Sequence, residues 1–237
     1  MRGERIRVRG LVQGVGFRPT VWRIAQACGL VGEVRNDGEG VLIHAWGEGI
    51  DGFCAELTAQ CPPLARIDAL ERAPLSTAPA HCDFRIVVSG GGDVRTGVVP
   101  DAATCVACRA EILDPSDRRY RYAFTNCTHC GPRLSIVARI PYDRANTSMG
   151  VFRMCPDCLR EYEDPGDRRF HAQPNACPAC GPRVWLLYPD GRVQEPVTPD
   201  PGDAIAAAGA LLAQGGLVAV KGIGGFLLAC DATYPDA

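Results

Sequence analysis

The stretch Val8-Arg-Gly-Leu-Val-Gln-Gly-Val-Gly-Phe-Arg-Pro19 decides how the first part of this chain folds. Hydrophobic residues alternate with arginines from Arg5 to Val12, which predicts a strand with one buried and one arginine-bearing face. A glycine loop follows, and Pro19 predicts the first turn of a helix. Such a loop directs several backbone N–H groups and a helix dipole at one point, so it can bind an anion, although a plain strand–helix turn has the same pattern. The candidate phosphate-binding residues are Gln13, Gly14, Val15, Gly16, Phe17 and Arg18.

Over the next seventy residues, segments with the helical hydrophobic period of about 3.6 residues alternate with segments that have the strand period of about two. They predict, in chain order, a helix from Pro19 to Cys28, strands at 31–36 and 41–46, a helix at 50–57, and strands at 67–73 and 84–88. This order indicates a small α+β sandwich with its helices on one face of an antiparallel sheet. We interpret His44 as a surface or packing residue of its strand and His81 as a solvated loop residue.

The stretch 8–19, together with Val34-Arg-Asn-Asp-Gly-Glu-Gly-Val41, resembles the acylphosphatase family over residues 5–89. The resemblance implies a ferredoxin-like domain at 1–92 that hydrolyses acyl phosphates. It implies that Arg18 binds the substrate phosphate and that Asn36 orients the attacking water. Catalysis would then rest on positioning and charge stabilisation, without a metal or a protein nucleophile.

The middle of the chain repeats itself after 50 residues. Each copy has the spacing Cys-x2-Cys-x18-Cys-x2-Cys. An Asp-x-Arg motif lies within the 18-residue stretch of each copy, and Gly-Pro-Arg follows its last cysteine. Four thiolates at this spacing predict a closed tetrahedral zinc site, which is structural because no coordination position stays open. Iron–sulfur ligation is the alternative, and we interpret His129 and His171 as bystanders. The predicted ligands, within 101–185, are Cys105, Cys108, Cys127, Cys130, Cys155, Cys158, Cys177 and Cys180.

Four Cys-x-x-Cys knuckles can pair in three ways, and we favour the local pairing within each repeat. Two structural Zn²⁺ ions follow from any of the three pairings. The other five of the thirteen cysteines, Cys28, Cys54, Cys61, Cys82 and Cys230, show no spacing pattern. We expect most of them to be small buried hydrophobic residues in a reducing compartment, which favours the cytoplasm.

The last part of the chain has a different pattern. A short hairpin at 185–193 and a linker at 196–203 precede a predicted helix at 204–214 and a strand at 217–220. Lys221, the only lysine, ends this strand before a glycine loop, and a lysine in this position is a weak candidate for binding a nucleotide phosphate. Residues 198–237 resemble the start of the YrdC-like nucleotide-binding α/β fold through Lys221, Gly224 and Gly225.

Taken in order, the three parts resemble the carbamoyltransferases of [NiFe]-hydrogenase maturation, the HypF family. Leu227 departs from the expected histidine. The resemblance implies hydrolysis of carbamoyl phosphate, ATP-dependent formation of carbamoyl adenylate, and transfer to the C-terminal cysteine of a partner protein for cyanide ligand synthesis. ATP would need a complete YrdC-like domain, so we expect the chain to be a fragment or a truncated product.

Two other classes of function compete with this interpretation. The first is a zinc-ribbon RNA-binding module, which a net charge of −2 and acids interleaved with the arginines of the zinc region disfavour. The second is a scaffold whose phosphate loop is inactive. No apolar run approaches the length of a membrane span, so we expect no membrane partner.

Overall fold

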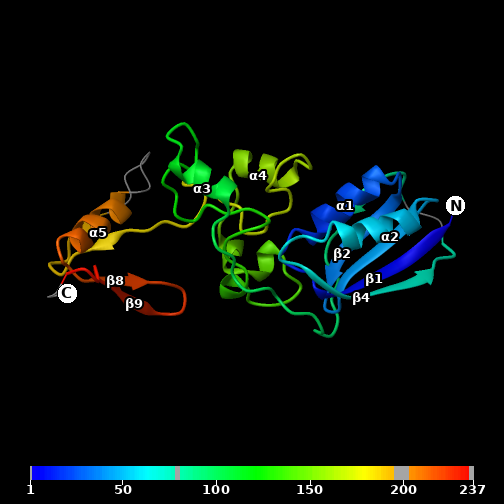
Figure 1. Ribbon diagram of the computed structural model, residues 1–237, viewed down its shortest axis with the longest axis horizontal. Coiled ribbons are helices and arrows are strands. Elements are labelled where there is room, and N and C mark those ends of the chain that lie inside the picture. Colours follow the sequence, from blue (N-terminus) through cyan, green and yellow to red (C-terminus); the bar gives the residue numbers. More distant parts are fainter. Residues whose placement is uncertain (1, 78–80, 195–202, 235–237) are drawn as a thin grey trace. The chain divides into compact units, whose positions relative to one another are not determined.

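The computed structural model describes residues 2–77, 81–194 and 203–234 (Figure 1). Within it the chain divides into two compact units. The first unit contains residues 1–105 and 126–175, and the second contains residues 106–125 and 176–237. Nearly all of the linker predicted at 196–203 lies outside the described residues.

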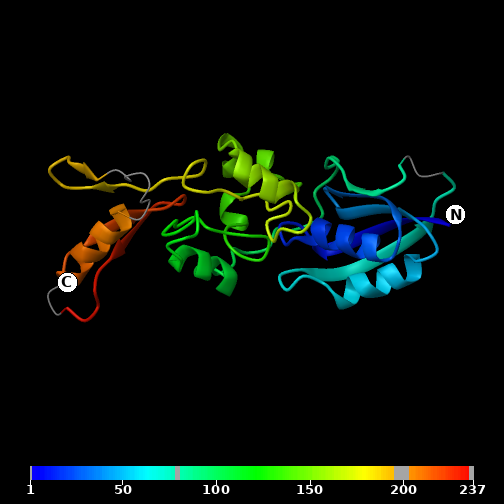
Figure 2. The same cartoon turned by 90° about the horizontal axis from the view of Figure 1, so that it is seen from above.

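The first unit is built on a five-stranded sheet of order β4-β1-β3-β2-β5. The helices α1 (Phe17–Ala27) and α2 (Ile50–Ala59) lie on one face of this sheet (Figures 1 and 2). The α+β, ferredoxin-like prediction is therefore confirmed. The strands are β1 (Gly3–Leu11), β2 (Val31–Asp37), β3 (Gly40–Trp46), β4 (Arg66–Pro74) and β5 (Phe84–Ile86).

The prediction of a wholly antiparallel sheet is wrong at one edge, where β5 pairs with β2 in parallel, with Gly32 opposite Phe84. Hydrophobic alternation predicts the faces of a strand and carries no information about its direction. The edge is tied to α1 because Trp22 Nε1 donates a hydrogen bond to Phe84 O at 2.9 Å.

The core lies between the sheet and the two helices. Ile6 and Val8 of β1 are completely buried, as the alternation predicts. The arginines of β1 do not all face solvent, however, because Arg7 is buried and its Nη1 donates to both carboxylate oxygens of Asp37, at 2.6 and 2.7 Å. This ion pair joins β1 to the end of β2, so Arg7 helps to hold the strand end that carries Asn36.

Helix α1 begins at Phe17, two residues before the predicted start. Gly16 precedes it with φ 73°, a left-handed conformation that glycine adopts without strain. Pro19 still lies within the first turn, where its missing N–H has no helical acceptor to lose.

The rest of the first unit is mostly irregular. Its elements are the 3-10 turns η1 (Leu134–Ile136), η2 (Arg144–Asn146) and η3 (Ser148–Val151), and the helix α4 (Pro156–Glu163). Helix α3 (Val106–Leu113), in the second unit, precedes α4 by the same 50-residue shift as the cysteines. Each helix starts directly after the first cysteine of its repeat, so the repeat is structural as well as sequential.

The second unit also contains two small hairpins and a helix. The first hairpin pairs β6 (Leu186–Leu187) with β7 (Val193–Gln194), which confirms the hairpin predicted at 185–193. Helix α5 (Asp203–Ala213) precedes the hairpin of β8 (Val218–Lys221) and β9 (Phe226–Ala229). Leu227 and Leu228 are 72% and 81% exposed. No helix of the described residues has the length and apolar character needed to cross a bilayer.

Candidate active site and metal centres

The loop between β1 and α1 has the geometry of an anion site. Gly14 and Gly16 both have positive φ angles, 76° and 73°. The first hydrogen bond of α1 runs from Thr20 N to Gly16 O at 3.1 Å, so the helix does not use the amides of Phe17 and Arg18. These amides, at the positive end of the helix dipole, are available to a phosphate group.

The loop is also packed tightly against the zinc-binding repeats. A Cβ atom at Gly14 would lie 3.2 Å from Arg133 Cδ, and one at Gly16 would lie 3.1 Å from Thr128 Cβ. Glycine is therefore required at both positions for two reasons, the backbone conformation and the close approach of a second segment.

Gln13 holds this loop in place through its side chain. Its Nε2 donates to Asp37 O at 2.7 Å and to Gly40 O at 2.9 Å, and its Oε1 accepts from Tyr142 N at 2.9 Å. The side chain is buried and all three of these bonds are to backbone. Gln13 is thus a structural connection between the loop, the turn after β2 and the zinc-binding region, and only its backbone is left for a phosphate.

Arg18 and Asn36 lie side by side, although 18 residues separate them in the sequence. With the amide of Asn36 oriented to satisfy both groups, its oxygen accepts hydrogen bonds from Arg18 Nε at 3.2 Å and Nη2 at 3.3 Å. Both side chains are buried. Nη1 of Arg18 donates to Ser89 Oγ at 3.2 Å, so all three nitrogens of the guanidinium have a hydrogen-bond partner that fixes its orientation.

Arg18 makes two further contacts, both with the segment that joins the first zinc-binding repeat to the second. Nη2 of Arg18 lies 2.8 Å from Asp143 Oδ1 and donates to Tyr142 O at 3.3 Å. Sequence reasoning missed both residues, because they lie in a segment that has neither a motif nor a hydrophobic period. Only the tertiary contact identifies them.

This site lies in a half-open pocket, with the loop of the acylphosphatase-like part on one side and residues of the zinc-binding region on the other. The cavity volume of this pocket is about 20 Å³, which is enough for about one water molecule. It is lined by Val12, Gly14, Gly16, Phe17, Arg18, Pro19, Asn36, Thr128, Arg133, Tyr142, His171, Ala172, Gln173 and Pro174.

His171 adds no charge to the pocket at neutral pH. Burial, assisted by the nearby Arg18 guanidinium, lowers the pKa of His171 to about 4. The cationic side chains of the lining are therefore Arg18 and Arg133. Burial likewise raises the pKa of Tyr142 to about 12, so its hydroxyl stays protonated.

Arg133, from the Gly-Pro-Arg of the first repeat, fastens the loop to the first pair of knuckles. Its Nε donates to Gly14 O, and its Nη2 donates to Cys127 O and Thr128 O, each at 2.9 Å. Arg133 as a whole is 1% exposed. The equivalent arginine of the second repeat, Arg183, is exposed.

Arg133→Ala is expected to lower the free energy of unfolding by about 3 kcal/mol, because several buried carbonyls lose a charged donor. It should also lower phosphatase turnover, because Gly14 is no longer held. Urea unfolding and phosphate release measure the two effects. Arg183→Ala is the matched control at the equivalent position and should change neither, and equal effects of the two variants would contradict this role of Arg133.

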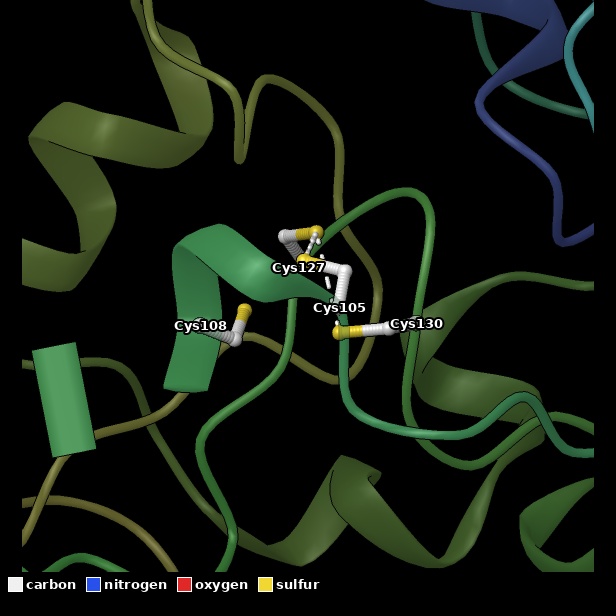
Figure 3. Close-up of side chains that lie close together, drawn as sticks. All are labelled: Cys105, Cys108, Cys127 and Cys130. Carbon is white, nitrogen blue, oxygen red and sulfur yellow. Dashed lines mark hydrogen bonds between the residues drawn. The ribbon is translucent and has the colours of Figure 1, made fainter. Parts of the chain in front are cut away.

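The eight predicted ligands form two clusters. One cluster is Cys105, Cys108, Cys127 and Cys130, and the other is Cys155, Cys158, Cys177 and Cys180. The sulfurs of each cluster lie within 4.8 Å of one another, and Figure 3 shows those of the first cluster facing one another. This is the local pairing, and neither His129 nor His171 belongs to a cluster.

The spacing of the sulfurs fits zinc. The distances Cys105–Cys127, Cys127–Cys130 and Cys177–Cys180 are each 3.8 Å. A tetrahedron with Zn–S bonds of about 2.3 Å has edges of about 3.8 Å. Four thiolates per cluster complete the coordination, so these sites would support the fold and leave no position for a substrate.

The Asp-x-Arg motifs connect the two repeats to each other. Arg119 of the first repeat donates from Nε to Ala176 O, next to Cys177, at 2.9 Å. Arg169 of the second repeat donates from Nε to Asn126 O, next to Cys127, also at 2.9 Å. Each repeat therefore supplies the arginine that holds the second knuckle of the other, which sequence spacing alone did not reveal.

The remaining candidate residues lie outside these sites. Cys54 is buried and Cys28 and Cys61 are half-buried, but Cys82 and Cys230 are exposed, so the expectation of burial is wrong for these two. His44 packs at the surface, with Nδ1 3.2 Å from Glu33 Oε1. Lys221 ends β8 before the glycine loop, and its ammonium lies 5.5 Å from the centre of the Phe226 ring.

Comparison with known proteins identifies both parts of this architecture. Residues 4–86 match the acylphosphatase family, and residues 104–137 and 154–187 match the HypF finger. An acylphosphatase of Caldivirga maquilingensis is 45% identical over 89 residues, which cover 94% of that protein. The carbamoyltransferase HypF of Rhodobacter capsulatus is 56% identical over 242 residues, which cover 100% of this chain and 31% of the relative.

The chain belongs to the HypF family. A crystal structure of full-length HypF in the phosphate- and nucleotide-bound form superposes with a TM-score of 0.83 at 44% identity, and the match covers 98% of this chain and 30% of that one. The probable carbamoyltransferase HypF of Methanocaldococcus jannaschii is 48% identical over 98% of this chain. The chain thus spans about 30% of the length of its HypF relatives and corresponds to their N-terminal part, which includes a hydrolase domain of the acylphosphatase type.

Proposed function

We propose that this part of HypF hydrolyses carbamoyl phosphate to carbamate and phosphate at Arg18 and Asn36. The observation that supports the proposal is the contact between these two side chains beside the free amides of the 13–18 loop. Carbamoyl phosphate is an acyl phosphate, the substrate class of the domain that residues 4–86 form.

The reaction requires positioning of two groups. The loop amides and the Arg18 guanidinium bind the phosphoryl oxygens and stabilise the charge that they carry in the transition state. Asn36 orients a water molecule for attack on phosphorus, in line with the bond to the carbamoyl oxygen. That bond breaks as the water adds, carbamate leaves, and the substrate phosphate accepts the proton of the water.

Further steps concern the longer protein. Carbamate would be activated with ATP as carbamoyl adenylate in a complete YrdC-like domain, of which residues 198–237, including Lys221, form the start. The carbamoyl group would then pass to the C-terminal cysteine of a hydrogenase maturation partner in the cytoplasm. Two zinc ions would hold residues 101–185 in shape throughout.

Phosphate release from carbamoyl phosphate tests the proposal, and Asn36→Ala gives the sharper result. The variant is expected to lower kcat by about 100-fold while KM changes less than about 3-fold, because Asn36 acts on the water and not on the phosphate. Circular dichroism and zinc content check that the variant is folded. A folded variant with unchanged kcat would remove Asn36 from the mechanism.

A further inference from the structure

The segment that joins the two zinc-binding repeats places hydrogen-bond acceptors on the phosphate-binding arginine. Asp143 Oδ1 and Tyr142 O both lie within hydrogen-bond distance of Nη2 of Arg18, at 2.8 and 3.3 Å. The side chain of Arg18 is only 9% exposed, and that of Asp143 is 26% exposed. A polar contact this close to the reacting group is part of the environment that a substrate enters.

These two acceptors are held rigidly on both sides. Tyr142 N donates to Gln13 Oε1, which fixes the segment to the phosphate loop. Arg144 N donates to Gln173 Oε1 at 2.8 Å, and Arg144 Nη1 donates to Gln173 O at 2.6 Å. The acceptors are therefore preorganised and are not a mobile surface contact.

A bound phosphate changes the hydrogen bonds of this group. Nη2 of Arg18 has two N–H bonds and three protein acceptors around it, Asp143 Oδ1, Tyr142 O and the amide oxygen of Asn36, so a phosphate oxygen that takes one of these N–H bonds displaces a protein acceptor. The carboxylate of Asp143 and the carbonyl of Tyr142 would then lack a donor, next to an anion. An acceptor left unsatisfied near a buried site is costly unless the ligand itself supplies an N–H.

Carbamoyl phosphate supplies that donor. Its amino group carries two N–H bonds on the carbon that bears the phosphate oxygen, whereas the methyl group of acetyl phosphate has a similar size and carries none. Steric fit alone cannot separate these two substrates, but a pair of acceptors can.

We propose that Asp143, together with the Tyr142 carbonyl, binds the amino group of carbamoyl phosphate and makes the site select it over other small acyl phosphates. This inference rests on the proposed hydrolysis at Arg18. It assigns to the segment between the zinc-binding repeats a direct part in substrate selection, with Asp143 as a specificity-determining residue.

The ratio of kcat/KM for carbamoyl phosphate to kcat/KM for acetyl phosphate tests the inference in the full chain. The unaltered protein is expected to favour carbamoyl phosphate by about 10-fold or more, the effect of one lost hydrogen bond to a charged group. Asp143→Ala should bring the ratio close to one. Asp143→Asn keeps an acceptor oxygen and should retain an intermediate ratio.

The ratio separates selection from a general effect on Arg18. If Asp143 only oriented Arg18 or competed with phosphate, its removal would change both substrates in parallel and leave the ratio unaltered, which would overturn the inference. Asp68→Ala removes an exposed partner of Arg66 (Nε–Oδ1 2.7 Å) and is the matched control, for which the ratio should stay at its original value.

Failure of this inference and failure of the proposed function give different results. Hydrolysis of neither substrate by the unaltered, zinc-loaded protein would contradict the proposed function. Equal hydrolysis of both substrates would leave the proposed function standing and contradict the selection by Asp143.

Discussion

Arg18→Lys is expected to lower kcat/KM for carbamoyl phosphate by about 1,000-fold, although the charge is kept. The guanidinium of Arg18 makes contacts through Nε, Nη1 and Nη2 at once, to Asn36, Ser89 and Asp143. An ammonium group is a single point of charge and cannot reproduce this planar arrangement or grip two phosphoryl oxygens in parallel. Phosphate release measured over a range of substrate concentrations gives the effect.

The control for Arg18→Lys lies on the same helix. Arg23 of α1 is exposed, so Arg23→Lys makes the same chemical change outside the pocket and should leave kcat/KM within about 2-fold. Turnover of Arg18→Lys within 10-fold of the unaltered protein would mean that another residue binds the phosphate. Arg133, the other cation of the pocket lining, would then be the first candidate.

Removal of zinc is expected to have the largest effect on stability. Each four-cysteine site contributes on the order of 10 kcal/mol to the fold of its segment. Elemental analysis of the reduced protein should give two zinc ions, and iron–sulfur absorbance would contradict the assignment. Chelation should increase hydrogen exchange throughout residues 101–185, while the core of the sheet, centred on Ile6 and Val8, stays protected.

Metal removal should also lower phosphatase activity, although four thiolates per site leave zinc no open position for a substrate. Arg133 holds Gly14 through carbonyls of the knuckle that carries Cys127, so the phosphate loop loses this support when the knuckle unfolds. A chelated protein with unaltered turnover would show that the loop is independent of the repeats.

Cys108→Ser tests whether the two sites depend on each other. The variant is expected to bind less than one zinc ion, because Arg119 of the first repeat donates to Ala176 O beside Cys177, and the second site loses this support when the first site unfolds. Cys82→Ser changes an exposed cysteine outside the clusters and should keep both ions. Retention of one full ion by Cys108→Ser would show that the sites fold separately.

Much of the candidate site was predictable because its requirements are local. A left-handed turn needs glycine at Gly14 and Gly16, and an anion site needs the helix N-terminus that follows them. The resemblance to acylphosphatases added Asn36, which no local rule would have connected to Arg18. The parallel pairing of β5 and the burial of Arg7 were not predictable, because each depends on a partner distant in the sequence.

The sequence by itself determined the α+β architecture, the glycine loop before α1 and the two sets of four cysteines. These follow from spacings of a few residues, over which one turn or one ion imposes its geometry. The Gly-Pro-Arg motif shows the limit of such spacings. Arg133 and Arg183 occupy the same place in the repeat, yet one is buried against the phosphate loop and the other is exposed.

Only the tertiary structure decided that the zinc-binding repeats form one wall of the candidate active site. Arg18 and Tyr142 are 124 residues apart in the sequence. Their hydrogen bond forms because residues 1–105 and 126–175 pack together in one compact unit. The same packing brings Asp143 to the guanidinium. A residue that acts through one long-range contact leaves no periodic trace in the sequence, since neither its spacing nor its neighbours are constrained by that contact.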